Sequence, residues 1–340
     1  MALWVYVTHV LTMATLPLEK GSGIGTILAN GTWPVAVFIL LSGFVISNSA
    51  TSRSYAAFIT KRAFRIFPVY LVCLAVSVAI LDISIEALHA APWDMKRRED
   101  RLFYLEESQR NFWPHLALHI PMLHGLMPRS SLPASPYAFM GQAWSLTLEW
   151  QFYIIAPLIF GIAKNRKADL VHYVVLGALL WVSKKFEQGS FILSYLWLFY
   201  VGHLAYRALQ NNSLGANTLI TCALLTAFNK NIAPILIFYG TLLAATRKPK
   251  SKYIGILNGP TSKFLGKISY SFYCSHMAAI YLTAYILIVS AEISDRALYG
   301  VLLILSSLAV SIGASILLQR TIEQPGIAIG AKISKRFNNG

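Results

Sequence analysis

The stretches MALWVYVTHVLTM (residues 1–13) and KFLGKISYSFYCSHMAAIYL (residues 263–282) decide the class of fold, because each is a largely apolar run with a histidine inside it. Apolar runs of similar length recur along the chain. Of the 340 residues, 56% are hydrophobic and only 13% are charged, and the mean hydropathy is +0.56. A soluble domain carries about 25% charged residues. The composition therefore predicts an integral membrane protein.

Apolar segments of about 20 residues cross a bilayer as helices, since a helix satisfies its own backbone hydrogen bonds. We therefore predict an all-α fold, a polytopic membrane helical bundle of about ten transmembrane helices. The predicted helices cover residues 1–18, 32–50, 65–85, 143–163, 168–183, 190–208, 214–229, 231–246, 264–289 and 297–319.

The longest connection between these helices, residues 87–142, is predicted to be an outer loop. Within it, residues 112–126 are apolar but short and contain two prolines, so we expect an interfacial or re-entrant segment. With both termini in the cytoplasm, most of the Lys and Arg residues fall on the cytoplasmic side, as the positive-inside rule requires.

The membrane domain is predicted to cover residues 1–323, followed by a basic cytoplasmic tail at residues 324–340. This topology accounts for the net charge of +15, because the excess of Lys and Arg lies on the cytoplasmic side. We therefore expect membrane lipid as a partner and no nucleic acid.

Two histidines, His9 and His276, lie inside predicted membrane helices. An ionisable group there is costly and usually faces a protein interior where it is paired or functional. A neutral imidazole is suited to act as a general base near physiological pH. His9 and His276 are therefore candidates for chemistry.

Polar residues share one face of the predicted fourth helix. Ser145, Glu149 and Tyr153 are spaced i, i+4 and i+8, with Trp144 beside them. We predict a catalytic role for Glu149 and substrate contacts for the other three. The alternative, a structural acid that pairs with Arg129 or another helix, stays open.

The predicted ninth helix repeats this pattern with Ser269, Tyr273 and His276. We predict that Tyr273 and His276 bind substrate. Polar residues in membrane bundles also form hydrogen bonds between helices, and that alternative stays open.

Lys61, Arg62 and Arg65 lie within about one turn near the start of the predicted third helix. Such a group of cations can hold the phosphates of a nucleotide-like ligand. The alternative is ordinary positive flanking of a membrane helix.

His115 and His119 are spaced i and i+4, with His124 nearby. They lack a third ligand at a recognisable spacing, so we predict no metal site. The three cysteines fall inside apolar runs without a CxxC pair and are expected to be buried thiols.

Five motifs give the chain a resemblance to the acyltransferase-3 family over nearly its whole length. They are VFILLSGFVISNS (37–49), FITKRAFRIFPVY (58–70), AWSLTLEWQFYIIAPL (143–158), LGKISYSFYCSHM (265–277) and QRTIEQP (319–325).

The resemblance implies an integral membrane O-acyltransferase, most often an O-acetyltransferase, in the bacterial inner (cytoplasmic) membrane. Such an enzyme takes an acyl group from cytoplasmic acyl-CoA, usually acetyl-CoA, and delivers it to a sugar hydroxyl. The acceptor is a surface or exported glycan, such as lipopolysaccharide or exopolysaccharide, or a lipid-linked glycan.

The resemblance also implies that His9 is catalytic and that the basic segment at Lys61, Arg62 and Arg65 is functional, which we assign to the phosphates of CoA. Members carry an arginine about three turns before this histidine, a position that would precede Met1. We therefore expect an upstream start codon, or another cation in its place.

The predicted chemistry needs a base, a donor for the developing oxyanion and positioning of the acceptor. We expect Glu149 to orient His9 or the acceptor hydroxyl. A transient acyl-histidine is an alternative to direct transfer. Two other classes of protein stay open, a transporter or flippase of a lipid-linked glycan and a non-catalytic scaffold.

Overall fold

The computed structural model describes residues 1–15, 23–28, 30–49, 54–164, 169–186 and 189–337. Every regular element among these residues is helical, which confirms the all-α prediction. The chain forms two compact units, each built from separate stretches of sequence.

Unit 1 comprises residues 1–31, 64–146 and 267–329. It contains α1 (Ala2–Ala14), α2 (Gly23–Leu28), most of α4 (Tyr55–Ala79), α5 (Leu81–His89), α6 (Arg98–Arg110), α7 (Phe112–His119), η2 (His124–Leu126), η3 (Gly141–Ala143), most of α14 (Pro260–Tyr285), η4 (Ile286–Ser290), α15 (Arg296–Leu318) and η5 (Gln319–Glu323).

Unit 2 comprises residues 32–63, 147–266 and 330–340. It contains α3 (Thr32–Ser49), most of α8 (Trp144–Lys164), α9 (Asp169–Ser183), α10 (Ile192–Gln210), α11 (Leu214–Ala227), α12 (Ala233–Arg247) and α13 (Lys252–Leu257). The last helix, α16 (Gln324–Arg336), begins in unit 1 and ends in unit 2.

Four helical stretches among the described residues are long and apolar enough to cross a membrane. They are Thr32–Ser49, Tyr55–Ala79, Pro260–Ser290 and Arg296–Arg336. Shorter apolar helices occur at Ala2–Ala14, Leu170–Ser183, Leu214–Ala227 and Ala233–Arg247. The chain is thus a helical, multi-pass membrane protein, and each predicted helix overlaps an observed one.

The third predicted helix differs most from the observed one, because α4 begins at Tyr55 and not at residue 65. Ser54 starts it, since its Oγ accepts a hydrogen bond from the backbone N–H of Ala57 at 3.2 Å. The basic residues that follow are good helix formers. Their charge therefore does not prevent the helix from starting before the apolar segment.

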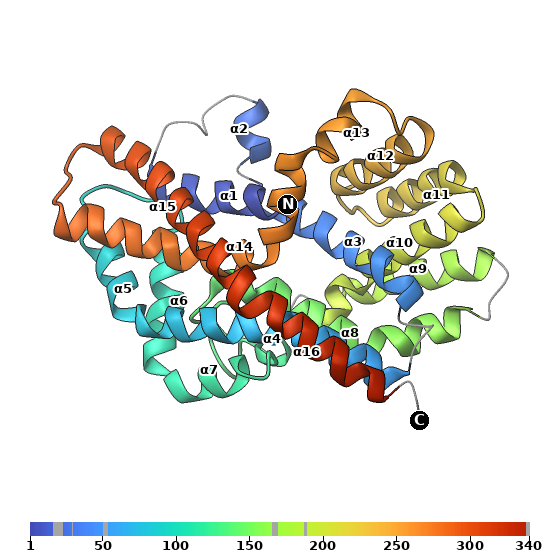
Figure 1. Cartoon of the computed structure of the whole chain (residues 1–340), viewed down its shortest axis with the longest axis horizontal. Coiled ribbons are helices and arrows are strands. Elements are labelled where there is room, and N and C mark those ends of the chain that lie inside the picture. The colour runs from blue at the N-terminus through green and yellow to red at the C-terminus, as the bar shows by residue number, and fades with distance from the viewer. Residues whose placement is uncertain (16–22, 29, 50–53, 165–168, 187–188, 338–340) are drawn as a thin grey trace. The chain divides into compact units, whose positions relative to one another are not determined.

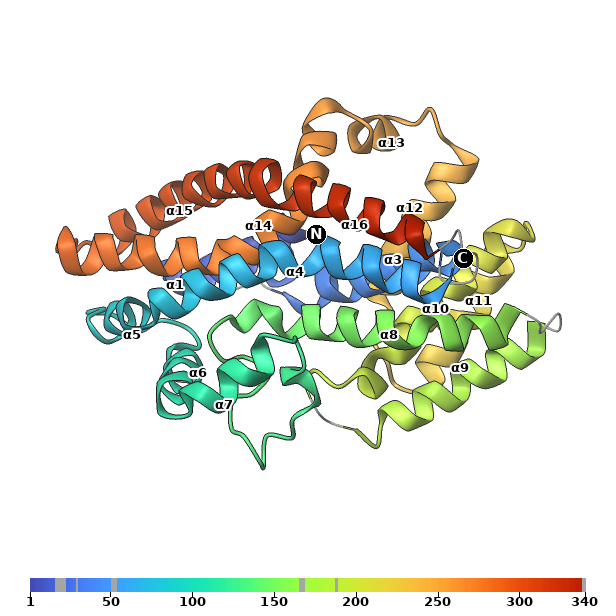
Figure 2. The same cartoon turned by 60° about the horizontal axis from the view of Figure 1, so that its bottom comes forward.

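In unit 1, α1 packs against α15 through small polar residues. Ser307, Ser311 and Ser315 recur every four residues along α15 and are fully buried. Tyr6 Oη lies 2.8 Å from Ser307 Oγ and donates to the carbonyl oxygen of Ile304 at 2.8 Å. Small residues allow such close helix contacts in membrane proteins. Nearby, α5, α6 and α7 follow one another as short packed helices (Figure 2).

In unit 2, α10 runs beside α3 and α9 in both views (Figures 1 and 2). The crossing of α3 and α10 is close because both helices have a glycine there. A Cβ atom on Gly43 would overlap the carbonyl oxygen of Phe199, and one on Gly202 would overlap that of Leu40. Only glycine lets the two backbones approach this closely.

Candidate active site

His9 lies on α1 one turn after Tyr6, the residue that ties this helix to α15. Residues three apart share a face of a helix, so the anchoring of Tyr6 also fixes where His9 points. The side chain of His9 is half-buried. Its ring centroid lies 5.5 Å from that of His276, with 36° between the ring planes.

His276 lies on α14 and is fully buried. Its Nδ1 donates a hydrogen bond to the carbonyl oxygen of Tyr273 at 2.8 Å. This bond assigns the proton of the neutral ring to Nδ1 and leaves Nε2 as an acceptor. Nε2 has no hydrogen-bond partner among the described residues. His276 can therefore accept a hydrogen bond from a substrate hydroxyl.

Arg101 on α6 brings a positive charge to the same place in unit 1. Its guanidinium donates to Thr12 Oγ1 at 2.6 Å and to the carbonyl oxygen of His9 at 3.4 Å. It also contacts Met13 Sδ at 3.3 Å and Tyr281 Oη at 3.5 Å.

Only 8% of Arg101 is exposed, and no carboxylate of a described residue forms an ion pair with it. A buried charge without a counterion is costly. Such a charge is expected where a negative charge binds or develops during a reaction.

Two predicted substrate-binding residues meet in unit 1. Ser145 Oγ lies 2.7 Å from Tyr273 Oη, and Tyr273 Oη donates to the carbonyl oxygen of Gln142 at 2.8 Å. Tyr273 also lies next to His276, with 5.8 Å between the ring centroids. Trp144, the first residue of α8, is half-buried.

The remaining predicted residues form a second group, in unit 2. Glu149 is 7% exposed, and its Oε1 accepts hydrogen bonds from Ser42 Oγ at 3.2 Å and from Tyr153 Oη. The guanidinium of Arg62 lies 5.4 Å from the ring centroid of Tyr153 and 5.5 Å from that of Phe58. A cation, an aromatic ring and a carboxylate are thus linked in this unit.

The three predicted phosphate-binding cations, Lys61, Arg62 and Arg65, all lie on α4. Arg62 donates to Ser49 Oγ at 3.2 Å, and Arg65 is exposed. The roles of these cations and of Glu149 stay predictions.

Arg101 lies in the charged run KRREDR and was not among the residues predicted for the site. A signal was present. Arg101, Leu102, Leu105 and Ser108 follow helical spacing, and all four are buried. The apolar members of this stripe indicate a packed helix face that includes the arginine.

His115, His119 and His124 are all fully buried in unit 1. The rings of His119 and His124 are stacked, with centroids 4.0 Å apart. Burial lowers the pKa of His119 to about 3 and that of His124 well below its usual value. No group of three or more His, Cys, Asp or Glu side chains in the described part of the chain is arranged to hold a metal ion. The absence of a metal stays a prediction.

Comparison with known proteins identifies relatives. A family model described as "Acyltransferase domain", the acyltransferase-3 family, matches residues 1–316. "Nodulation protein 10" of Rhizobium leguminosarum bv. viciae is 29% identical over 163 residues, which are 44% of this chain and 41% of that protein. An "O-acetyl transferase" of Shigella phage Sf6 is 25% identical over 215 residues, which are 60% of this chain and 57% of that protein.

The chain spans about half the length of these curated relatives. No solved structure matches it.

Proposed function

The chain belongs to the acyltransferase-3 family, and from this premise we propose that it is a membrane O-acetyltransferase. It takes the acetyl group from cytoplasmic acetyl-CoA and transfers it to a sugar hydroxyl of a surface or exported glycan. The relative from phage Sf6 is named an O-acetyl transferase, which supports acetyl as the transferred group. The proposed location is the bacterial inner membrane, crossed by ten helices with both termini in the cytoplasm.

The observation that carries this proposal is the meeting of His9, His276 and Arg101 in unit 1. An acyl thioester is already activated, so transfer to an alcohol needs a base and a stabilised oxyanion more than a strong nucleophile. His9 and Arg101 supply these two functions. His276 accepts a hydrogen bond at Nε2 and can orient the hydroxyl.

The reaction follows from these roles. The acceptor oxygen attacks the thioester carbon while His9 takes its proton, and Arg101 stabilises the negative charge on the carbonyl oxygen. The C–S bond then breaks, and the leaving CoA thiolate receives the proton from His9. The ester and free CoA are the products, and no metal takes part.

We assign the donor phosphates to Lys61, Arg62 and Arg65, because cations on one helix turn bind phosphates well. Glu149 holds Tyr153 by a hydrogen bond, and Tyr153 lies against Arg62. In this proposal Glu149 acts on the donor side through Tyr153 and Arg62, and the expectation that it orients His9 or the acceptor hydroxyl stays a prediction from the sequence.

The test is acyl transfer by the purified full chain in lipid nanodiscs. Acetyl-CoA is added with a glycan extract from a strain that lacks the gene, and free thiol is measured with a thiol-reactive dye. We expect thiol release that depends on the glycan, and an acetyl ester on the product by mass spectrometry. Movement of a lipid-linked glycan across the bilayer without thiol release would show a transporter instead.

A further inference from the structure

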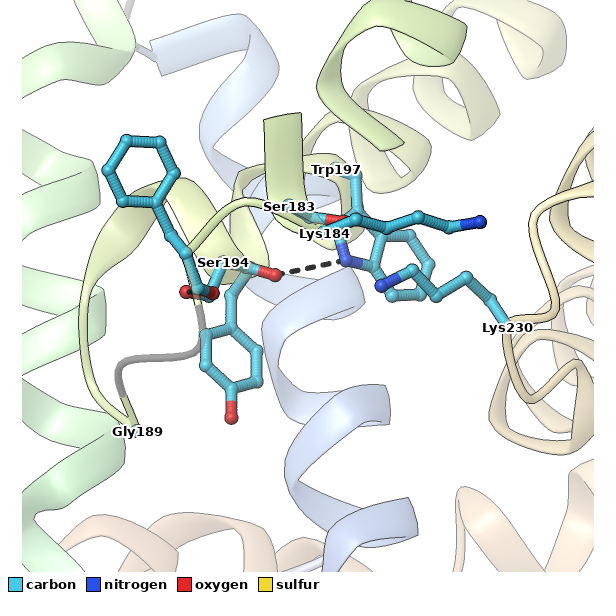
Figure 3. A pocket seen from close by; sticks show the side chains of 8 residues that line it. Ser183, Lys184, Gly189, Ser194, Trp197 and Lys230 are labelled. Carbon is cyan, nitrogen blue, oxygen red and sulfur yellow. Dashed lines mark hydrogen bonds between the residues drawn. The ribbon is translucent and has the colours of Figure 1, made fainter. Parts of the chain in front are cut away.

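Unit 2 contains a cavity of about 470 Å³ that the proposed chemistry does not use. The cavity lies where α9 ends, α10 begins and the turn after α11 passes, and Lys184, Lys230, Trp197, Ser194, Tyr195 and Phe186 contribute to its lining (Figure 3). Its volume falls in the range of about 300–1,000 Å³ that is usual for small-molecule sites.

Two lysines give the cavity a positive charge. Lys184 and Lys230 come from different connections, and Figure 3 shows both side chains beside Trp197. Within the described residues, neither forms an ion pair with a carboxylate. Burial and the neighbouring charge of Lys184 lower the pKa of Lys230. Two cations held together, with no acid paired to them in the described part of the chain, attract an anion.

The lining also includes three aromatic residues, Phe186, Tyr195 and Trp197. The indole N–H of Trp197 donates to the carbonyl oxygen of Ser194 at 3.2 Å, which sets the orientation of the ring (Figure 3). Lys230 Nζ lies 5.6 Å from the Trp197 ring centroid, and Lys184 Nζ lies 5.2 Å from that of Phe228. Aromatic faces with polar groups at their edges suit amphipathic ligands such as sugar rings.

Two lysines beside aromatic side chains favour a ligand with a flat, partly apolar body and an attached negative charge. A neutral sugar would leave the two lysines without a partner, and a simple inorganic anion would not use the aromatic walls. In the predicted topology, α9 ends and α10 begins on the outer side of the membrane, where a glycan acceptor arrives.

We propose that this cavity binds an anionic sugar of the acceptor, one that carries a carboxylate or a phosphate group. The proposal rests on the proposed function, since it takes the acceptor to be a glycan. An anionic lipid headgroup offers the same negative charge, so the experiment separates the two sources.

The test is a direct binding measurement without any acyl donor, on the full chain in phosphatidylcholine nanodiscs. The probes are trigalacturonic acid and galactose 6-phosphate, with neutral galactotriose for comparison. We expect at least one anionic probe to bind about tenfold tighter than galactotriose, and added salt to weaken it. The double variant Lys184→Gln, Lys230→Gln should lose about tenfold in affinity.

Lys185→Gln is the matched control, because Lys185 also follows α9 but lies over Trp181, 5.4 Å from its ring centroid, and does not line the cavity. It should bind like the wild type. Equal losses in Lys185→Gln and the double variant would overturn the proposal, as would lack of binding by both anionic probes. Lysine-dependent binding of short-chain phosphatidylglycerol alone would assign the cavity to a lipid headgroup and overturn it too.

Failure here is distinct from failure of the proposed function. The binding assay contains no acetyl-CoA, and thiol release is measured separately. A chain that releases thiol but binds no anionic sugar at this cavity contradicts only this inference.

Discussion

At the scale of single residues, the proposed chemistry depends on His9 lying beside His276 and Arg101. His9 is the proposed base, and Arg101 is the proposed stabiliser of the oxyanion. A fixed cation can stabilise an oxyanion because it needs no rearrangement during the reaction. The base and the cation thus have separate roles that can be tested one at a time.

Substitution of His9 by alanine tests the base. We expect His9→Ala to lower kcat by roughly 10²- to 10⁴-fold, the usual contribution of a general base, with little change in expression. Thiol release from acetyl-CoA is the measurement. His89→Ala is the control, because His89 is exposed and its Nε2 lies 3.1 Å from Glu106 Oε1. No step of the proposed reaction uses His89. Full activity of His9→Ala would remove His9 from the mechanism.

Substitution of Arg101 by methionine tests the oxyanion role. We expect kcat to fall about 10²-fold or more while KM changes little, since the charge acts mainly on the transition state. Arg101→Lys should retain part of the activity, and added guanidinium should partly rescue Arg101→Met. Arg97→Met is the control, because Arg97 is exposed and pairs with Asp100 at 3.2 Å. An equal fall in both variants, or a rise in KM alone, would contradict the assignment.

Several of these residues could be found from sequence, whereas the signal for Arg101, the helical spacing it shares with Leu102 and Leu105, was weak beside the charges around it. Helical spacing predicted that Ser145, Glu149 and Tyr153 share a face, and all three are buried. The meeting of Ser145 with Tyr273 is a tertiary contact that periodicity cannot give. Arg101 was hidden because a charged run is usually a solvated face.

At the scale of helices, the α3–α10 crossing depends on two glycines. Gly43→Ala should destabilise unit 2 by about 1 to 3 kcal/mol, because the added methyl group overlaps the backbone of α10 and forces the helices apart. The melting temperature of the purified protein is the measurement. Gly177→Ala is the control, since a Cβ there meets nothing within 4 Å. A melting temperature of Gly43→Ala equal to that of the control would show that the helices are not in close contact.

The histidines of α7 and η2 predict a pH dependence of stability. Burial lowers the pKa of His119 to about 3, whereas an unfolded histidine titrates near about 6.5. The unfolded state therefore binds more protons between these values, so stability is full above about pH 6.5 and falls as the pH drops toward about 3. The slope is at most about 1.4 kcal/mol per pH unit for each histidine.

The measurement is the melting temperature at about pH 7.5 and about pH 5. His119→Gln should reduce the difference between the two, and the exposed His89→Gln should leave it unchanged. An unchanged difference in His119→Gln would show that this ring is not buried in its neutral form.

The helices themselves were well predicted because hydrophobic length is a strong signal in membrane proteins. Within residues 87–142, the helix α6 and its buried face were not predicted, since their order comes from packing. There, α6 and α7 bury Arg101, His115 and His119, polar residues that sequence alone places on the surface.

At the scale of the whole molecule, the net charge of +15 predicts how the chain is oriented across the membrane. The basic residues near Lys61, Lys250 and Lys335 flank the proposed cytoplasmic ends of the helices, and such residues resist translocation across the membrane. Three basic residues used in that argument, Arg53, Arg166 and Lys167, lie outside the described residues. The remaining cations still predict which connections of unit 2 face the cytoplasm.

Cysteine labelling tests this orientation. In a variant without the three native cysteines, Lys185→Cys follows α9 and Lys250→Cys follows α12, and both positions are exposed. A maleimide that cannot cross the inner membrane should label Lys185→Cys in cells whose outer membrane is permeable and whose inner membrane is intact. It should label Lys250→Cys only after the inner membrane is disrupted, because the positive-inside rule places this connection in the cytoplasm. The reverse pattern would invert the topology and move the cavity of Lys184 and Lys230 to the cytoplasmic side, where no exported glycan could reach it.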